Sequence, residues 1–179
     1  MGILRISVRA RLVLLLVFVN VALLGAAGYA WYALARLNAE FDAAITTQNQ
    51  IEAASDVARR AQLEFWGQLR VWGQVLLATE EAQSQHLQTF KDRGDKVKEY
   101  LEGLGGQLKA LGVAEELARD ATKEHQSVTS RYLAAAKGLK AGNLGTVLEA
   151  NTVVRGMDRA VLDRIDALVN AIQDRKSVV

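Results

Sequence analysis

The chain of 179 residues contains no cysteine and no proline. The lack of cysteine excludes disulfide bonds, thiolate catalysis and zinc sites built on cysteine. Proline interrupts a helix because it removes a backbone hydrogen bond and collides with the preceding turn, so its absence permits long continuous helices. Strand-rich folds depend on frequent Gly and Pro turns and are disfavoured. We therefore expect an all-α chain.

Residue types that carry catalysis or bind metals are also scarce. Only two histidines occur, His86 and His125, and they fall in different predicted helices. The chain has no H-E-x-x-H motif, no calcium-loop spacing and no G-x-G-x-x-G phosphate loop, because the glycines at 103, 105 and 106 are spaced differently. The sequence thus predicts no enzyme, no metal site and no cofactor.

The net charge is only +2, and its location argues against a nucleic-acid partner. Arg5, Arg9 and Arg11 lie in the first eleven residues, with no acidic residue among them. Without these three, 19 Lys and Arg stand against 20 Asp and Glu. Nucleic-acid binding needs a basic face on the folded domain, whereas this excess is a short tail. We expect no nucleic-acid partner.

One long apolar run predicts a membrane anchor. Residues 12–35 are 24 consecutive uncharged residues. As a helix they span about 36 Å, enough to cross a hydrocarbon core of about 30 Å. The arginines flank the N-terminal end of this run, so the positive-inside rule predicts that residues 1–11 are cytoplasmic and residues 36–179 lie outside. No later stretch is long enough to cross again, which predicts a single-pass protein.

The alternative for the apolar run is a cleaved signal peptide. Ala33-Leu34-Ala35 has the form that a signal peptidase accepts. The apolar region of a signal peptide spans only about 7–15 residues, which is shorter than the run observed. The length therefore favours a retained anchor.

Four amphipathic segments follow the anchor and predict helices at residues 37–78, 82–111, 114–141 and 144–176. In the second segment apolar or glycine positions recur in steps of three and four, as in the seam of a packed helix: Leu87, Phe90, Gly94, Val97, Leu101, Leu104, Leu108 and Leu111. Helices joined by short connections pack up-down-up-down. We expect a transmembrane helix that continues into an antiparallel four-helix bundle, whose last helix returns towards the membrane.

Local signals mark the ends of these helices. Thr79 is the expected N-cap of the second helix, and Gly112 is the expected C-cap glycine at its end. Gly142-Asn143 is a turn signal between the third and fourth helices. Gly103, Gly105 and Gly106 lie inside the second helix, where glycine lowers helix propensity. They predict a kink or close packing against a neighbouring helix.

Binding is the remaining class of function, and two arginines on the first bundle helix are its candidates. Arg59 and Arg70 are eleven residues apart, close to three full turns, and therefore share a face. Guanidinium groups hold carboxylates in bidentate fashion. The alternative is that both are ordinary surface arginines. Trp66 lies between them, and like Trp72 it is more typical of a core or dimer interface than of a ligand cage.

Several segments resemble those of bacterial methyl-accepting chemotaxis proteins. The basic opening at residues 5–12 is similar to the start of many such receptors. Residues 65–77, with a phenylalanine before a tryptophan and a paired leucine, resemble one branch of their four-helix-bundle sensor domains, as does Phe90 on the next helix. Residues 155–159 resemble a Gly-x-Asp-Arg element in the fourth helix of that branch. The resemblance covers essentially the whole chain.

This resemblance implies a homodimeric sensor whose bundle is periplasmic and whose anchor lies in the inner membrane. In the family, ligands bind near the membrane-distal end, between the first and fourth helices at the dimer interface. The corresponding region of this chain holds Arg59, Arg70, Asn151 and Thr152. The aspartate and serine receptors carry arginines at closer spacing on the first helix, and this chain lacks that pattern, which argues against an amino-acid ligand. We expect a small-molecule ligand such as an organic acid.

The resemblance also implies a second membrane helix and a methylated cytoplasmic coiled coil, and the 179 residues contain neither. The expectation is a receptor truncated before its second transmembrane helix, or a natural fragment. Two alternatives stay open. The same sensor bundle can precede a histidine kinase or a cyclic-dinucleotide enzyme, or it can be a stand-alone anchored bundle that binds a protein partner.

Overall fold

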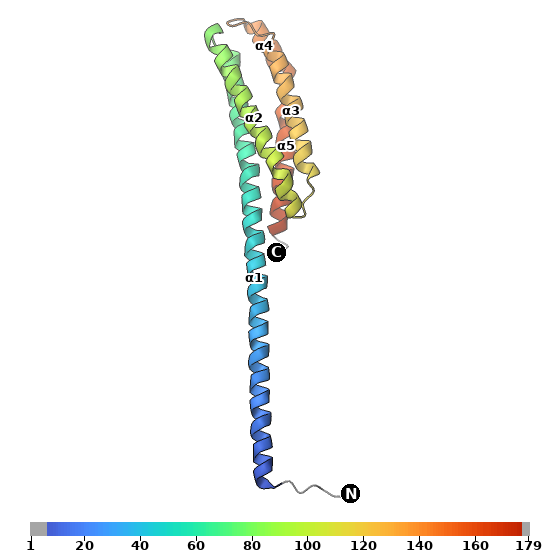
Figure 1. Cartoon of the computed structure of the whole chain (residues 1–179). Coiled ribbons are helices and arrows are strands. Elements are labelled where there is room, and N and C mark those ends of the chain that lie inside the picture. The colour runs from blue at the N-terminus through green and yellow to red at the C-terminus, as the bar shows by residue number, and fades with distance from the viewer. Residues whose placement is uncertain (1–6, 177–179) are drawn as a thin grey trace. The chain divides into compact units, whose positions relative to one another are not determined.

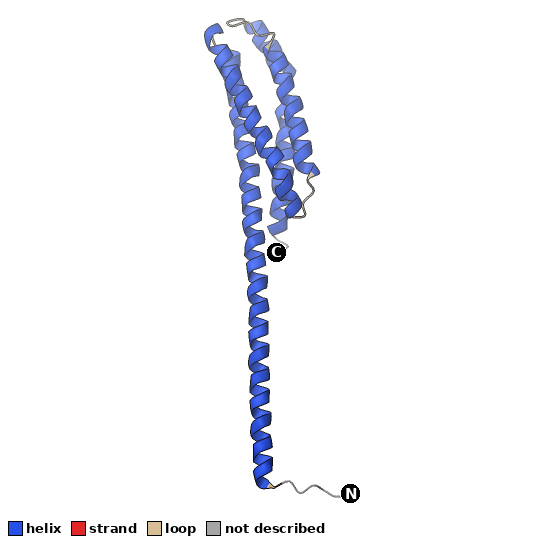
Figure 2. Ribbon diagram, in the orientation of Figure 1, coloured by secondary structure: helices blue, strands red, loops and turns tan. Residues whose placement is uncertain are grey.

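A computed structural model describes residues 7–176, and within them it contains five helices and no strand. The prediction of an all-α chain is confirmed (Figures 1 and 2). The helices are α1 (Val8–Leu77), α2 (Glu80–Ala110), α3 (Glu116–Ala136), α4 (Leu144–Val154) and α5 (Met157–Lys176). The predictions that involve Arg5 and residues 177–179 lie outside the described residues. The chain divides into two units, residues 1–46 and 47–179.

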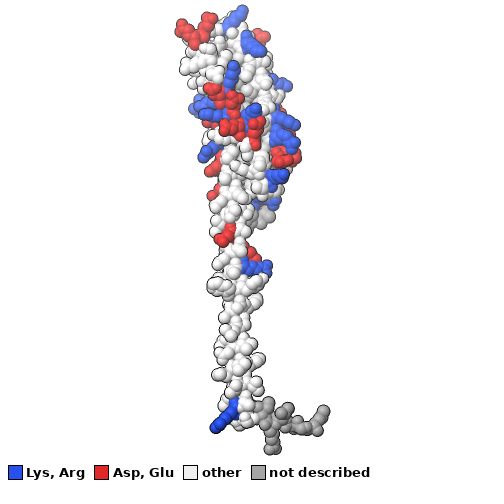
Figure 3. All heavy atoms as spheres, viewed as in Figure 1, with Lys and Arg blue, Asp and Glu red and all other residues white. Residues whose placement is uncertain are grey.

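The first unit contains the apolar part of α1, which is the only helix of the described residues long and apolar enough to cross a membrane. Its large apolar side chains are exposed, and Figure 3 shows the stretch without charged side chains on the visible face. The lone polar group, Asn20, donates from Nδ2 to the Leu16 carbonyl at 2.8 Å. A polar side chain satisfied within its own helix suits an apolar surrounding, where no water can serve it.

The second unit is an antiparallel up-down bundle, in which α4 and α5 together form the fourth leg (Figure 1). The predicted apolar stripes fill its core. In α2, Phe90, Val97, Leu101, Leu104 and Leu108 are at most 1% exposed. In α5, Val161, Ile165, Leu168 and Ile172 are fully buried. Each stripe covers one face of its helix, so the hydrophobic effect fixes which face points inward.

The turn between α2 and α3 confirms the prediction for Gly112, which has a φ of 64°. The Val113 amide donates to the Leu108 carbonyl at 2.9 Å, and the Gly112 amide donates to the Lys109 carbonyl at 3.1 Å. These two bonds form a Schellman motif, which needs a left-handed residue at this position. Arg175 of α5 donates from Nη2 to the Gly112 carbonyl at 3.0 Å and so ties the end of α5 to this turn.

The opposite end of the bundle, which we call the tip, holds the α1–α2 and α3–α4 connections (Figure 1). Thr79 occupies the predicted N-cap position of α2, although its side chain makes no capping bond. The predicted turn at Gly142-Asn143 is confirmed, with a φ of 73° at Gly142. The Asn143 Oδ1 accepts from the Thr146 amide at 3.2 Å and caps α4.

The predicted third helix was too long. It was expected to reach residue 141, but α3 ends at Ala136. Lys137 and Gly138 form a turn, and the Thr146 hydroxyl accepts a hydrogen bond from the Lys140 amide at 3.1 Å. Leu139 kept the apolar period without being helical, because it packs against the core from the connection. Periodicity alone does not show whether an apolar residue such as Leu139 belongs to the helix or to the connection after it.

The predicted continuous helix at residues 144–176 was also wrong, since it is broken between α4 and α5. Gly156 has a φ of 77°, a left-handed conformation that glycine adopts readily and that cannot belong to a right-handed helix. On the first helix, Phe41 and Ile45 fall within the segment expected to pack in the bundle, but they are 59% and 57% exposed. The buried face of α1 begins at Ile51.

The glycines inside α2 were predicted to mark a kink or close packing. The helix is continuous through Gly103, Gly105 and Gly106. A Cβ atom built on any of these three would meet no atom within 4 Å, so close packing does not explain them. Gly94, in contrast, does make a close approach, as described below.

Candidate functional site

Besides its buried face, the bundle part of α1 carries a row of outward-facing residues, which we call the outer α1 stripe. It consists of Arg59, Leu63, Trp66, Arg70, Gly73 and Leu77. All six residues are exposed, including three large apolar side chains: Leu63 is 69%, Trp66 51% and Leu77 86% exposed. The steps of four and three residues are those of a seam that packs against another helix. Within a single chain this seam stays uncovered.

The two candidate arginines lie on this stripe but in different surroundings. Arg59 has Asp56 three residues earlier and lines a cavity of about 420 Å³ together with Glu52 and Asp56. Neither arginine takes part in an ion pair of the described residues, but Arg70, unlike Arg59, has no acidic residue three or four positions away on α1. Of the two candidate arginines, Arg70 is therefore the one without a neighbouring acidic side chain on its own helix.

The two arginines lie far apart along the axis of α1. Arg70 and the candidates on α4 lie at a similar distance from the tip of the bundle. Eleven residues correspond to about 16 Å of rise, which is more than one small carboxylate can bridge. Arg70 lies seven residues before the end of α1, and Asn151 lies seven residues after the start of α4. Because both ends are at the tip, both residues lie about 10 Å below it.

Asn151 and Thr152 are exposed, like Arg70. The Thr152 hydroxyl donates to the Leu148 carbonyl at 2.7 Å, so its oxygen can still accept a hydrogen bond. Among the described residues no hydrogen bond or ion pair joins the four candidates Arg59, Arg70, Asn151 and Thr152 to one another. A single chain therefore presents them as separate surface groups.

Behind the outer stripe, the inner face of α1 holds a buried polar cluster that sequence reasoning missed. Gln68 of α1 and His125 of α3 are 1% and 2% exposed. The Gln68 Oε1 lies 2.9 Å from His125 Nε2, so the neutral ring donates its Nε2 proton there. Gln68 Nε2 donates to the Thr129 hydroxyl at 3.3 Å. Gly94 of α2 makes room for this amide, since a Cβ there would lie 2.6 Å from Gln68 Nε2.

Burial keeps the His125 ring neutral. Desolvation lowers the pKa of His125 from 6.5 to about 4, although the negative charge of Asp95 opposes this shift. The ring meets Phe65 edge-on, with 5.7 Å between the centroids. Its second nitrogen, Nδ1, is buried without a hydrogen-bond partner. The imidazole is thus held as a neutral donor between α1 and α3.

A reciprocal contact lies beside this cluster on the α1–α2 interface. Arg93 of α2 crosses α1 at Gly67, where a Cβ atom would collide with its guanidinium group. The same guanidinium forms an ion pair with Glu64 at 2.8 Å. Gly67-Gln68 on α1 thus faces Arg93-Gly94 on α2, and each glycine receives the long side chain of the other pair. This arrangement fixes the register of the two helices.

Three aromatic rings pack together nearer the tip, one from each of the first three helices. Trp72 and Tyr132 meet edge-on at 5.0 Å between centroids, and Phe90 stacks on Tyr132 at 5.7 Å. Burial raises the pKa of Tyr132 from 10 to about 12, and the nearby charge of Asp158 adds to this shift. Trp72 is thus a core residue, whereas Trp66 faces outward. The sequence alone did not distinguish the environments of these two tryptophans.

Among the described residues, no group of three or more His, Asp or Glu side chains could hold a metal ion. Gln68 and His125 were missed because polar residues at core positions of a periodic stripe look like errors in the pattern. The one available signal was positional, since Gln68 follows Phe65 by three residues on the buried face.

Comparison with known proteins identifies a family for this chain. The sequence model of a family described as the Tar ligand binding domain homologue matches residues 3–176. No curated protein and no solved structure matches the chain significantly.

Proposed function

The chain belongs to the family of Tar ligand binding domain homologues, the sensory modules of methyl-accepting chemotaxis receptors, and from this premise we propose how it binds its signal. It is an inner-membrane protein with an apolar helix that suits a single crossing, and its family is not a family of enzymes. We propose that the chain acts by ligand binding alone and that the sensor is a homodimer with a periplasmic bundle.

The outer α1 stripe is the observation that carries this proposal. Three large apolar side chains share the stripe with two arginines, and all five are exposed in one chain. A second copy of the stripe would cover Leu63 and Trp66 and bring two copies of Arg70 to one interface. Apolar surface removed from water stabilises the pair by about 25 cal/mol per Å².

The proposed ligand is a small organic anion held by Arg70. Arg70 lacks an acidic neighbour on its helix, and Asn151 and Thr152 lie at the same depth below the tip. A guanidinium group donates two parallel hydrogen bonds to a carboxylate, and the amide and hydroxyl groups suit further oxygens. Arg59, placed about 16 Å away beside Asp56, is proposed to act in the interface rather than on the same carboxylate.

Ligand binding is tested on the full chain in lipid nanodiscs by thermal unfolding with succinate, L-malate, citrate and benzoate. A ligand that binds only the folded state raises the melting temperature. The matched variants are Arg70→Gln and Arg60→Gln, since Arg60 is an exposed arginine of the same helix that lies outside the stripe. We expect Arg70→Gln to weaken binding at least tenfold and Arg60→Gln to change it less than twofold. No shift with any probe, or equal losses in both variants, would overturn the proposed site.

Orientation and assembly are tested separately by single cysteines, which the cysteine-free chain accepts without background. Ser127→Cys, on the exposed side of α3, should react with a membrane-impermeant maleimide in intact cells, and Ser7→Cys should not. Leu63→Cys should form a disulfide-linked dimer. The opposite labelling pattern would invert the topology, and a Leu63→Cys chain that stays monomeric under oxidation would refute the α1 interface.

A further inference from the structure

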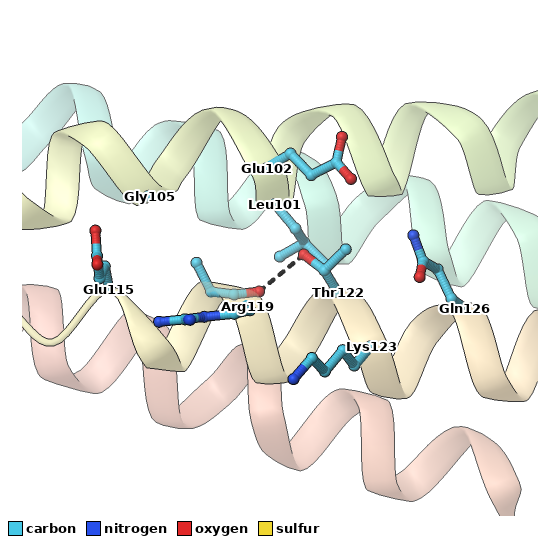
Figure 4. A pocket seen from close by; sticks show the side chains of 9 residues that line it. Leu101, Glu102, Gly105, Glu115, Arg119, Thr122, Lys123 and Gln126 are labelled. Carbon is cyan, nitrogen blue, oxygen red and sulfur yellow. Dashed lines mark hydrogen bonds between the residues drawn. The ribbon is translucent and has the colours of Figure 1, made fainter.

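Gly105, one of the open glycines of α2, lies beside a groove that no feature of the proposed dimer uses. The groove has a volume of about 430 Å³ and lies between α2 and α3 (Figure 4). Gly105 is part of its wall, and an added Cβ there would meet no atom within 4 Å. Helix packing therefore does not require glycine at this position, and the missing side chain leaves the groove open.

The α2 wall of the groove is acidic, whereas the α3 wall carries two cations and one acidic residue, Glu115, at the N-terminal end of α3. Glu102 projects from α2, whereas Arg119 and Lys123, four residues apart on one face, project from α3 (Figure 4). No ion pair of the described residues crosses between these walls. Glu102 pairs with Lys98 of its own helix at 3.8 Å, and Arg119 pairs with Glu116 of its own helix at 3.0 Å. Lys123 has no ion-pair partner among the described residues.

The floor of the groove is buried and largely satisfied. Leu101 and Ala118 are at most 2% exposed, and Thr122 is 7% exposed. The Thr122 hydroxyl donates to the Ala118 carbonyl at 2.8 Å, which is the dashed bond in Figure 4. Its oxygen keeps the capacity to accept a hydrogen bond from a donor that enters the groove.

From this arrangement we propose that the α2–α3 groove at Gly105 is a second ligand site, which takes a small zwitterion within one subunit. The anionic end meets Arg119 and Lys123, and the cationic end meets Glu102 across the groove. A molecule with both charges joins walls that a single-charge ligand would satisfy on one side only. This site is independent of the proposed Arg70 site, because it lies between the second and third helices and needs no second copy.

The test uses the full chain in nanodiscs and a ladder of ω-amino acids: glycine, β-alanine, 4-aminobutyrate, 5-aminopentanoate and 6-aminohexanoate. Dissociation constants are measured by isothermal titration calorimetry, with butyrate and n-butylamine as single-charge controls. We expect one length to bind best and at least tenfold more tightly than either control. Lys123→Gln and Glu102→Gln should each weaken this binding at least fivefold.

The decisive variant is Gly105→Leu, which fills the groove at a position where a side chain has free space and the helix gains propensity. It should weaken binding of the best probe at least tenfold, whereas Gly103→Leu, on the same helix but outside the groove, should change it less than twofold. Arg70→Gln should leave it unchanged.

Three results would overturn the inference: no ladder member binds, Gly105→Leu binds as well as the original chain, or both leucine variants lose binding equally. Loss of zwitterion binding in Arg70→Gln but not in Gly105→Leu would assign the zwitterion to the outer stripe. That result would refute the second site and leave the proposed function standing.

Discussion

Two faces of α1 carry side chains at the same spacing, but one face is buried and the other is exposed. On α1 the inner seam, Ala54, Ala58, Ala61, Phe65, Gln68, Trp72 and Val75, and the outer α1 stripe both advance in steps of four and three residues. The two seams lie about 150° apart around the helix. The inner seam is buried against α2 and α3, while the outer seam is exposed. A seam-like period therefore reports that a helix face packs, but not whether its partner belongs to the same chain.

The inner seam also shows how a polar pair can be part of a core. Gln68 and His125 satisfy each other, and Gly94 supplies the space for the amide. The outer seam places its polar groups, Arg59 and Arg70, in water, where they cost nothing to keep. Burial makes the inner polar groups sensitive to exact fit and to pH, and the outer ones available to ligands.

The largest expected effect comes from truncating one residue of each seam. Phe65 is 1% exposed and contacts the His125 ring, so Phe65→Ala should lower the free energy of unfolding by about 3–5 kcal/mol. Leu63→Ala, two residues earlier on the outer seam, should change it by less than about 0.5 kcal/mol. Urea unfolding of the detergent-solubilised chain, followed at protein concentrations low enough to keep it monomeric, measures both. Similar losses would erase the distinction between the seams.

A second prediction concerns association through the outer seam. Trp66→Ala should leave the unfolding of the single chain within about 0.5 kcal/mol of the original. It should weaken the proposed dimer by about 2 kcal/mol, or about 30-fold in the dissociation constant, because buried tryptophans dominate interface energies. Sedimentation equilibrium in detergent gives the dissociation constant. If Trp66→Ala instead unfolds the single chain, the outer seam is packed internally.

The third prediction is a pH dependence that belongs to the inner seam. Because the folded pKa of His125 is about 4 and the unfolded value is 6.5, the unfolded state binds more protons between these values. The stability contributed by the neutral ring is complete above pH 6.5 and is lost as the pH falls, by about 2 kcal/mol between pH 7.5 and 5. His125→Gln removes this dependence, so the difference between the two chains isolates it. Parallel pH profiles would show that the ring is not desolvated.

The smallest effects come from two glycines of α2 that receive the same substitution. Gly94→Ala should destabilise the chain by about 1–2 kcal/mol, because the new Cβ meets the Gln68 amide. Gly105→Ala should stabilise it by up to about 1 kcal/mol, since the space is open and alanine is the better helix former. Thermal unfolding of both variants gives the signs. Stabilisation by Gly94→Ala would mean that the Gln68 amide yields easily.

Much of the fold could be read from the sequence, because long periodic stripes and helix-end residues carry strong signals. The helical form of the apolar run, the buried face of α2 and the turns at Gly112 and Gly142 were all predicted correctly. The break at Gly156 was not, since a single glycine between two apolar segments of matching phase is also compatible with one helix. The end of α3 was misplaced because Leu139 continues the period into the connection.

The site was less accessible to sequence reasoning. Spacing placed Arg59 and Arg70 on one face, but it could not show that Asp56 accompanies only one of them in a shared cavity. The partners Gln68 and His125 are 57 residues apart, and no local pattern brings them together. The groove at Gly105 arises from two helices, and only the absence of a packing neighbour distinguishes this glycine from Gly94.

The left-handed residue at Gly156 gives α4 an independence that the other helices lack. Eleven residues form a helix that is marginal in isolation, and only Ala150 and Val154 of α4 are buried. Since α5 begins its own hydrogen-bond ladder at Met157, α4 can open without unwinding the fully buried stripe behind it. Backbone amides of α4 should then exchange with deuterium as a separate, early-opening unit. Asn151 and Thr152, two residues of the proposed ligand site, thus belong to the helix whose order the proposed ligand should change most.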